Sequence, residues 1–437
     1  MDVAVTPSLS RPEGSVAAPG SKSELIRLII CAALSDSPTV IGGFSPSDDV
    51  GAALSCVRAL GARVDSDGKV RRIIPGEAPE GFSLFDCKES ATVLRFMLPV
   101  ASALLGAGSF TGSGRLPGRP LGALITAMRT GGVCFEYGMT PSDADSEDTS
   151  RRKRLPLRMT GRLRPGVYEL PGNISSQYVS GILTALAITP GESRIELTTK
   201  LESAPYADMT ADTLRLFGAD IRKTPGGYAV RGRHRLLSPG SAGAGGDWSA
   251  AAFFLTAGAI GGRVTVTGLD PRSPQGDRRI TRLLRLFGAK VETDDGGGIT
   301  VSRPEGGLTA VSADISDTPD LLPALAVAAA FADGESVFTG GSRLRLKESD
   351  RLASVTSLIN ALGGEARELP DGIAVRGGRL PGGIADACGD HRVVMAAAVA
   401  GLFCPGGVLI KGAGAVGKSY PAFFEDLALI GGKTNAV

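Results

Sequence analysis

The sequence predicts an α/β protein of two lobes, each built from three repeated units. The main observation is a short pattern that recurs six times: an apolar helix end, a glycine, a small residue and the start of a strand. The glycines of this pattern are Gly61, Gly131, Gly218, Gly288, Gly363 and Gly431. They lie 70, 87, 70, 75 and 68 residues apart, so units of about 70 residues fill the chain of 437 residues. Glycine suits this position because the residue after a helix often adopts a left-handed conformation, which penalises a side chain.

The second observation is that strand-like and helix-like segments alternate within the units. Residues 264–267 read Val-Thr-Val-Thr, which favours a strand, whereas residues 278–287 have helical periodicity. A stretch rich in Gly, Ser and Pro, residues 238–246, separates the third unit from the fourth and is the expected linker. We therefore expect three units on each side of it and a cleft between the lobes, where small-molecule sites usually lie.

Composition and charge narrow the class of protein. The chain has 43% hydrophobic and 21% charged residues, and its net charge of +2 gives no general attraction to nucleic acid. Residues 1–20 are rich in Pro and Ser and lack the apolar core of a signal peptide. The apolar runs 321–331 and 393–403 are too short to span a bilayer and are expected to be buried helices. The expectation is a cytoplasmic protein that contacts neither membrane nor nucleic acid.

Residue types that bind metals are sparse. The histidines are His234 and His391, which makes a zinc site improbable. The six cysteines show no CxxC spacing and are expected to be reduced core residues. They are Cys31, Cys56, Cys87, Cys134, Cys388 and Cys404. We expect no metal and no cofactor.

The longest interval between repeat glycines contains a polar run, residues 140–154, which we interpret as an inserted loop. It ends in the basic residues Arg151, Arg152, Lys153 and Arg154. This cluster could bind phosphate, although a solvated loop is the better interpretation.

Several polar segments stand at the start of an apolar helix. Lys22 and Ser23 precede an apolar run that contains Arg27, and the free N–H groups of a helix start favour anions. A capping serine beside an exposed lysine would explain the same residues equally well. Residues 88–95, Lys-Glu-Ser-Ala-Thr-Val-Leu-Arg, lead into another apolar helix. Residues 173–178, Asn-Ile-Ser-Ser-Gln-Tyr, do the same and suit either a ligand or a helix cap.

Other segments bring charge to loops. The glycine-rich turn 112–120 carries Arg115 and Arg119, and a guanidinium can bind a carboxylate or phosphate through two hydrogen bonds. Asp320 precedes an apolar helix, where it could cap the helix or act as a general base. Residues 345–351 hold three cations and two acids in seven positions, with bases bracketing the acids. This order indicates a site that binds anions and moves a proton, although the start of a surface helix could also look like this.

Residues 412–419 match the phosphate-loop pattern GxxxxGK[ST] in full after a strand-like segment. Only 18 residues follow Ser419, which leaves no room for the later strands of a nucleoside triphosphatase core. Pro421 is also expected in the first turn of the following helix. We therefore reject the nucleotide-binding interpretation, while Lys418 could still bind a phosphate or carboxylate.

Together these segments resemble the 5-enolpyruvylshikimate-3-phosphate synthase family of enolpyruvyl transferases, over nearly the whole chain. The matching residues, in chain order, are Lys22-Ser23 with Arg27, Ser47-Asp48-Asp49-Val50, Arg115 with Arg119-Pro120, Ser175-Ser176-Gln177, Ser203 with Pro205-Tyr206, Gln275-Gly276-Asp277, Pro319-Asp320, Arg345 with Lys347-Glu348 and Asp350-Arg351, Asp390-His391-Arg392, and Lys418-Ser419-Tyr420-Pro421.

The resemblance implies a two-lobed, inside-out α/β barrel of six βαβαββ repeats, three per lobe, with the chain crossing twice. Residues 21–240 would form the first lobe, and residues 1–20 with 245–437 the second. The implied reaction transfers the enolpyruvyl group of phosphoenolpyruvate to the 5-hydroxyl of shikimate 3-phosphate and releases phosphate through a tetrahedral intermediate. A monomer whose lobes close on the substrates is expected.

The resemblance also implies roles for individual residues. Phosphoenolpyruvate would be bound by Lys22, Ala91, Arg119, Gln177, Arg351, Arg392 and Lys418. Shikimate 3-phosphate would be bound by Lys22, Ser23, Arg27, Ser175, Ser176, Gln177, Ser203, Asp320 and Lys347. The catalytic residues would be Lys22, Asp320 and Glu348. Asp320 would take the 5-hydroxyl proton, and Glu348, with Lys22, would handle protonation at C3.

The chain departs from the family pattern before Arg95. Ala91 stands where the family has a glycine that lines the phosphoenolpyruvate pocket, so its methyl group should crowd a ligand and weaken binding of glyphosate, the bulkier inhibitor. Lys88 is a second departure, which either points to solvent or adds a cation.

Two rival interpretations remain. The sister transferase acting on UDP-N-acetylglucosamine usually has a cysteine at the place of Gly114 and an asparagine at the place of Ser23. A binding protein without activity would be expected to lose the acids and keep the cations, yet Asp320 and Glu348 are both present.

Overall fold

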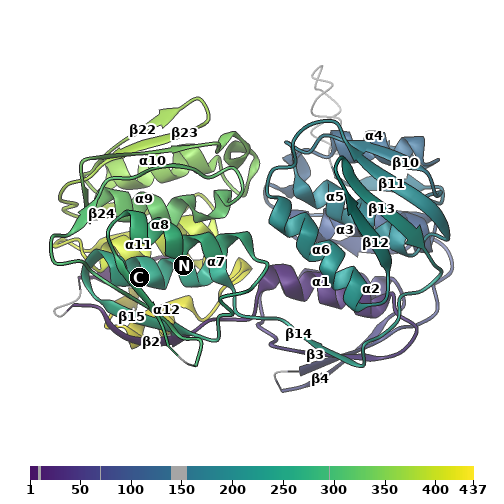
Figure 1. Ribbon diagram of the computed structural model, residues 1–437, viewed down its shortest axis with the longest axis horizontal. Helices are drawn as coiled ribbons and strands as arrows, with labels where there is room; N and C mark the ends of the chain where they lie inside the picture. Colours follow the sequence, from purple (N-terminus) through teal and green to yellow (C-terminus); the bar gives the residue numbers. More distant parts are fainter. Residues whose placement is uncertain (8–10, 69, 139–154, 295) are drawn as a thin grey trace. The chain divides into compact units, whose positions relative to one another are not determined.

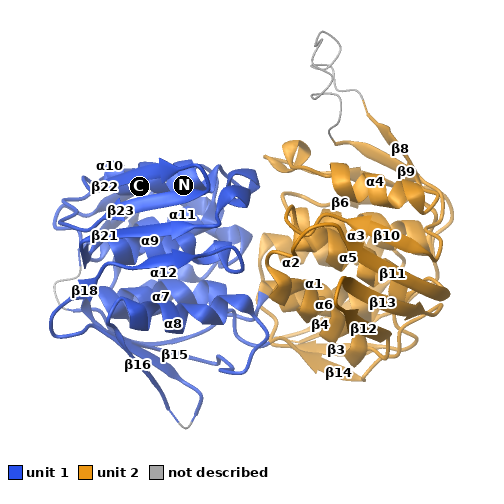
Figure 2. Ribbon diagram, turned by 45° about the horizontal axis from the view of Figure 1, so that its top comes forward, with its two compact units in different colours: residues 1–21, 245–437 blue, residues 22–244 orange. Residues whose placement is uncertain are grey.

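The computed structural model describes residues 1–437 except 8–10, 69, 139–154 and 295. The chain divides into two compact units (Figure 2). Unit 1 comprises Met1–Ser21 and Gly245–Val437, and unit 2 comprises Lys22–Ala244. The basic run at 140–154 lies outside the described residues.

All six repeats share one topology, which the second repeat of unit 2 illustrates. It runs β6 (Leu84–Asp86), α3 (Ala91–Leu104), β7 (Ala107–Thr111), α4 (Gly122–Thr130), β8 (Cys134–Tyr137) and β9 (Leu157–Thr160). Its first strand pairs in parallel with the second, and the fourth lies antiparallel between the second and the third. This is the predicted βαβαββ order, and the prediction of six such repeats, three in each unit, is confirmed.

The remaining elements of unit 2 form two more repeats with the same sheet topology (Figure 1). The first repeat contains α1 (Lys22–Ala33), β3 (Thr39–Gly42), α2 (Asp48–Ala59), β4 (Arg63–Asp67), β5 (Val70–Ile74) and β14 (Ser241–Gly243). The third contains β10 (Val167–Leu170), α5 (Ser176–Ala187), β11 (Gly191–Leu197), α6 (Ala204–Leu216), β12 (Asp220–Thr224) and β13 (Gly227–Gly232). The predicted linker, residues 238–246, therefore contains β14, whose parallel pairing with β3 completes the first repeat.

Unit 1 takes two strands from the N-terminus of the chain. Its first repeat contains β2 (Glu13–Ala17), α7 (Trp248–Gly261), β15 (Arg263–Thr267), α8 (Ile280–Leu286), β16 (Lys290–Thr293) and β17 (Ile299–Ser302). The second contains β19 (Ser312–Asp314), α9 (Leu322–Ala330), β21 (Glu335–Thr339), α10 (Arg351–Ala361), β22 (Glu365–Leu369) and β23 (Gly372–Arg376). The third contains β24 (Gly383–Asp386), α11 (His391–Gly401), β25 (Val408–Lys411), α12 (Phe423–Leu429), β26 (Lys433–Ala436) and β1 (Val3–Thr6).

Short elements fill the connections. They are the strands β18 (Leu308–Thr309) and β20 (Ala332–Asp333) and the 3-10 helices η1 (Leu116–Gly118), η3 (Gly276–Arg279), η4 (Pro319–Leu321), η5 (Ser342–Leu346) and η6 (Ala413–Lys418). The strands β18 and β20 pair with each other in parallel.

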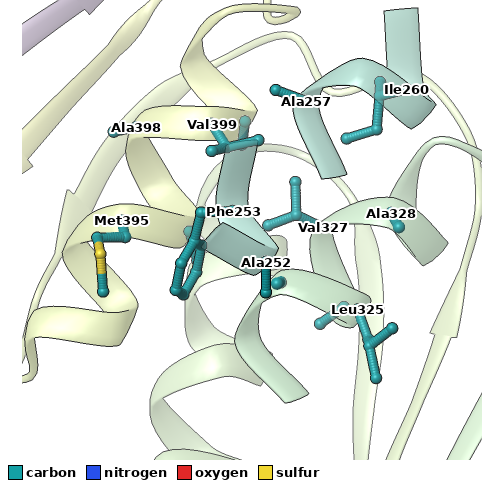
Figure 3. Close-up of a cluster of buried hydrophobic side chains, with 14 of the residues drawn as sticks. Ala252, Phe253, Ala257, Ile260, Leu325, Val327, Ala328, Met395, Ala398 and Val399 are labelled. Carbon is teal, nitrogen blue, oxygen red and sulfur yellow. The ribbon is translucent and has the colours of Figure 1, made fainter. Parts of the chain in front are cut away.

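The core of unit 1 is built from helices, with the sheets outside them. Every residue of α7, α9 and α11 is buried, which confirms that the apolar runs near 321–331 and 393–403 form buried helices. Phe253 of α7, Val327 of α9 and Val399 of α11 belong to one hydrophobic cluster (Figure 3). In unit 2, α3 and α5 supply much of the corresponding core. Helices inside and sheets outside are the inside-out arrangement that was predicted.

Two details differ from prediction. Gly131 does not have the left-handed conformation of the other five repeat glycines; its φ is −79°, and Gly132 has a φ of +90° instead. Position 131 requires glycine for another reason: a Cβ there would overlap the hydroxyl of Tyr168. Four of the six cysteines are buried as expected, but Cys134 and Cys388 are exposed.

Candidate active site

The predicted site residues gather at helix starts in both units. In unit 2, Lys22 is the first residue of α1, Ala91 the first of α3, and Ser175 the N-cap of α5, where its hydroxyl accepts a hydrogen bond from the Gln177 amide. Each of these helices is the first helix of its repeat. Backbone N–H groups at a helix start have no partner inside the helix, so these positions suit anions.

Arg95 of α3 joins the starts of α3 and α5 in unit 2. Its Nη1 donates to Gln177 Oε1 at 2.7 Å and to Ser175 Oγ at 3.4 Å, and its Nη2 donates to the carbonyl of Pro120 at 3.1 Å. Gln177 Nε2 donates to Thr92 Oγ1 at 2.7 Å. Sequence reasoning gave Arg95 no role, although it ends the segment 88–95 that was singled out. The signal that could have indicated a role for Arg95 was a charged residue within the apolar run of an expected helix.

Arg27 connects α1 with α6. It donates to Thr210 Oγ1 at 2.8 Å, to the Ser23 carbonyl at 2.6 Å and to the Tyr206 carbonyl at 2.9 Å. Burial lowers the pKa of Arg27 to about 10, against the opposing effect of Tyr206 and other neighbours. The predicted residue Ser203 precedes α6 with a left-handed φ of 53°, a conformation that costs energy for a serine and is often found at functional sites.

Lys22 forms an ion pair with Asp49, at 2.8 Å between Nζ and Oδ2. The Asp49 side chain is only 5% exposed, so the ammonium group is held in one place. Asp49 was part of the matching motif but had no predicted role. Ser176 is buried as the first residue of α5.

In unit 1, Asp320 is surrounded by three cations. Its Oδ1 accepts hydrogen bonds from Arg351 Nη1 at 2.7 Å and Lys347 Nζ at 3.2 Å, and its Oδ2 from Arg392 Nη2 at 3.3 Å. Burial would raise the pKa of Asp320, but Arg392, Lys347 and Arg351 together outweigh it, although Glu348 opposes them, and hold the pKa well below 3.8. The resting carboxylate is therefore ionised.

Arg351 is the centre of this cluster and is 1% exposed. Besides Asp320, it donates from Nη2 to Glu348 Oε2 at 2.8 Å and to Asp390 Oδ1 at 3.1 Å, and from Nε to Asp390 Oδ2 at 2.9 Å. Asp390 N-caps α11 and also accepts the hydroxyl of Ser349. Burial lowers the pKa of Arg351, but Asp390, Glu348 and Asp320 raise it above its ordinary value. Four of the five guanidinium N–H groups are used by these contacts within the described residues.

Some of the singled-out residues face elsewhere. Arg345 and Asp350 bind each other at 3.0 Å and do not contact Asp320, and Lys88 pairs with Asp86 at 2.6 Å. The phosphate-loop match forms the 3-10 helix η6, in which Lys418 is buried, and α12 begins only at Phe423, so Pro421 precedes the helix rather than lying in its first turn.

Among the described residues, no group of three or more His, Cys, Asp or Glu side chains could hold a metal ion. No helix in that part of the chain has both the length and the apolar character needed to span a membrane.

Cations held at helix starts bind anions, and carboxylates among those cations can move protons. The fold and the two clusters thus define an α/β enzyme that acts on anionic small molecules.

Residues 8–427 match the sequence profile of EPSP synthase (3-phosphoshikimate 1-carboxyvinyltransferase). The 3-phosphoshikimate 1-carboxyvinyltransferase of Methanopyrus kandleri is 38% identical over 431 residues, 97% of each chain. That of Clostridium perfringens is 35% identical over 435 residues, 98% of each. The structure of EPSP synthase from Acinetobacter baumannii aligns over 100% of both chains with a TM-score of 0.80 at 26% identity. The chain belongs to the EPSP synthase family.

Proposed function

We propose that the chain transfers the enolpyruvyl group of phosphoenolpyruvate to the 5-hydroxyl of shikimate 3-phosphate and releases phosphate. The observation that carries the assignment of residues is the Asp320 carboxylate held among Arg351, Arg392 and Lys347. Both substrates are polyanions, so cations must offset their repulsion. The 5-hydroxyl must lose a proton while C3 gains one, so the reaction also requires acids and bases.

The binding residues form two sets, one for each substrate. Phosphoenolpyruvate is bound by Arg119 and Gln177 of unit 2, by Arg392 and Lys418 of unit 1, and by the remaining N–H of Arg351. Ala91 lies beside this ligand. Shikimate 3-phosphate is bound by Ser23, Arg27, Ser175, Ser176, Gln177 and Ser203 of unit 2 and by Lys347 and Asp320 of unit 1. Lys22 reaches both. The fixed orientation of Gln177, which Arg95 and Thr92 hold through its amide, supports its place in both sets.

Asp320 acts as the base for the 5-hydroxyl. With a pKa well below 3.8 it is ionised but weakly basic before the substrates bind. Substrate anions then compete with Asp320 for Lys347, Arg351 and Arg392. Because these cations are what lowers the pKa, their partial withdrawal raises the basicity of Asp320 when a hydroxyl is present to react. Glu348, with Lys22, handles the proton at C3.

Phosphate release from phosphoenolpyruvate, measured with and without shikimate 3-phosphate, tests this function. We expect release to depend on shikimate 3-phosphate and to fall by about 100-fold or more in Asp320→Ala, since general base catalysis contributes ~10²–10⁴-fold. The matched control is Arg367→Met on β22, which removes an exposed ion pair with Glu335 of β21 and should retain full activity. Release that requires UDP-N-acetylglucosamine instead would identify the sister reaction, and silence with either acceptor would favour a binding protein.

We also infer that the chain works as a cytoplasmic monomer without a nucleic-acid partner. Six free thiols suit a reducing compartment. The net charge of +2 supports the absence of a nucleic-acid partner.

A further inference from the structure

The segment that carries Lys347 and Glu348 has little regular structure of its own. It consists of the 3-10 helix η5, three further residues, and Asp350, which N-caps α10 by accepting the Ala353 amide at 3.2 Å. A side chain on such a segment is placed only as well as the segment itself is held. The contacts that hold it therefore bear on the position of both side chains.

The β22–β23 hairpin binds this segment at two places, just before its start and at Arg345. At the start, the Gly341 amide donates to the Asp371 carbonyl at 2.6 Å and the Gly340 amide to Asp371 Oδ2 at 3.1 Å. Further on, Arg345 Nη1 donates to Glu368 Oε2 at 2.6 Å and its Nη2 to the Leu369 carbonyl at 3.3 Å. The hairpin thus contacts the segment through bonds that do not involve Asp320.

Arg345 also ties the segment to itself. Its Nη1 lies 3.0 Å from Asp350 Oδ2, so one guanidinium links η5, the N-cap of α10 and the hairpin turn. Between the two linked positions, Lys347 and Glu348 reach Asp320 and Arg351. Next to Arg345, Leu344 is fully buried and Arg343 donates to the Ser316 carbonyl at 2.6 Å, which joins the segment to the loop before Asp320.

We propose that Arg345 is a positioning residue for the transfer reaction: by binding Asp350 and the β22–β23 turn, it fixes where Lys347 and Glu348 stand relative to the substrates. This role rests on the function proposed above for those two side chains. Arg345 itself touches no substrate. The side chains in its ion pairs are about one-third exposed, and exposed pairs contribute little to stability. We therefore expect loss of Arg345 to lower the catalytic rate rather than the free energy of unfolding.

Steady-state kinetics of Arg345→Met, Arg345→Lys and Asp371→Ala test the role, with Arg367→Met on the same hairpin as the matched control. We expect Arg345→Met to lower kcat about 10- to 100-fold, because small misplacements of catalytic groups have effects of this size. KM for shikimate 3-phosphate should rise more than KM for phosphoenolpyruvate, since Lys347 is assigned to the former. Arg345→Lys should recover part of the loss. Asp371→Ala should show the same split between the two KM values at smaller size, because it removes the contact of Oδ2 with the Gly340 amide and leaves the backbone contact with Gly341 in place.

The apparent Tm and far-UV circular dichroism of each variant separate positioning from folding. Near-normal kcat and KM values in Arg345→Met, equal to those of Arg367→Met, would overturn the proposal, as would an equal rise in both KM values. Should Arg345→Met not fold, Arg345→Lys and Asp371→Ala decide by the same criteria. Lys347→Met and Glu348→Gln distinguish a failure of the underlying function: if these two retain full activity, the assignment of their roles is wrong whatever Arg345 does.

Discussion

Arg351 shows how one buried cation can organise several acids. Its guanidinium binds Asp390, Glu348 and Asp320 at once, and Asp390 is fully buried behind it. Removing one partner of a buried ion pair leaves an uncompensated charge, so the three carboxylates depend on Arg351 for their positions. Within the described residues, four of its five N–H groups donate to these three carboxylates.

Ala91 gives a prediction that concerns one methyl group. Ala91 is buried at the first position of α3, next to the N-cap Ser90. If its methyl group crowds a ligand at this helix start, Ala91→Gly should tighten glyphosate inhibition by about tenfold, equivalent to ~1.4 kcal/mol, and lower KM for phosphoenolpyruvate modestly. Inhibition constants measured at several phosphoenolpyruvate concentrations check this. Ala103→Gly in the last turn of the same helix is the control, and equal inhibition of the wild type and Ala91→Gly would refute the prediction.

Residue roles could be proposed from sequence only where a local motif carries them. Lys22, Asp320 and Glu348 stand in short motifs that match the family. The contacts of Arg95 and Asp49 were not foreseen because their partners lie far along the chain: Arg95 binds Gln177, 82 positions away. No local pattern reports such a contact.

At the scale of elements, α3 and α5 pack closely where they position the site. Pro99 lies inside α3 and has no amide hydrogen, so the Arg95 carbonyl lacks its usual helical donor. Gly181 of α5 approaches that carbonyl, and a Cβ at Gly181 would overlap it and lie 3.1 Å from Pro99 Cγ. The proline and the glycine together allow the two helices to approach, and this approach brings Arg95 to Gln177.

Gly181→Ala should therefore both destabilise the protein and impair the site. We expect a loss of about 1–3 kcal/mol, because overpacking a core forces backbone shifts of this energy. Urea unfolding checks the loss. Gly51→Ala in α2, where a Cβ meets nothing within 4 Å, is the matched control and should stabilise by about 0.5–1 kcal/mol. Equal stability of the two variants would show that the helices can separate without cost.

The repeat could be predicted from sequence because each unit carries the same local signal after its second helix. Five of the six glycines have the expected left-handed φ, and their spacing matches the repeats. The strands β1, β2 and β14 were not predicted as members of their sheets. β14 pairs with β3 across about 200 residues, and β2 pairs with β15 across about 250. Pairing over such distances is decided by the fold and not by any neighbouring residue.

For the whole molecule, buried charge makes stability depend on pH. The cations Lys347, Arg351 and Arg392 face the acids Asp320, Glu348 and Asp390. Asp277, also fully buried, is an additional acid. Ser249 donates to its Oδ2, while its Oδ1 has no hydrogen-bond partner among the described residues. Burial, reinforced by Asp320 and opposed by Arg392, raises the pKa of Asp277 to about 6.

The sign of the effect follows from the two acids separately. Asp277 binds its proton more tightly in the folded protein, so its contribution to stability is full below pH 3.8 and is lost as the pH rises through about 6. Asp320 has the opposite shift, so its contribution is full above pH 3.8 and is lost as the pH falls through its lowered pKa. Of these two acids, Asp277 is the one that changes between pH 4 and 6, and its contribution to stability should fall as the pH rises.

The substitution Asp277→Asn isolates the contribution that ionisation of Asp277 makes to stability. The amide is neutral at every pH and its oxygen can still accept the Ser249 hydroxyl, so the variant should be more stable than the wild type at pH 7 by up to about 3 kcal/mol, the equivalent of two pKa units. At pH 4 the difference should vanish. Apparent Tm measured at pH 4, 5, 6 and 7 checks this, with Asp333→Asn at an exposed strand end as the control. A difference between Asp277→Asn and the wild type that stays constant across this range would mean that Asp277 does not titrate there, and that a neighbouring cation keeps it ionised.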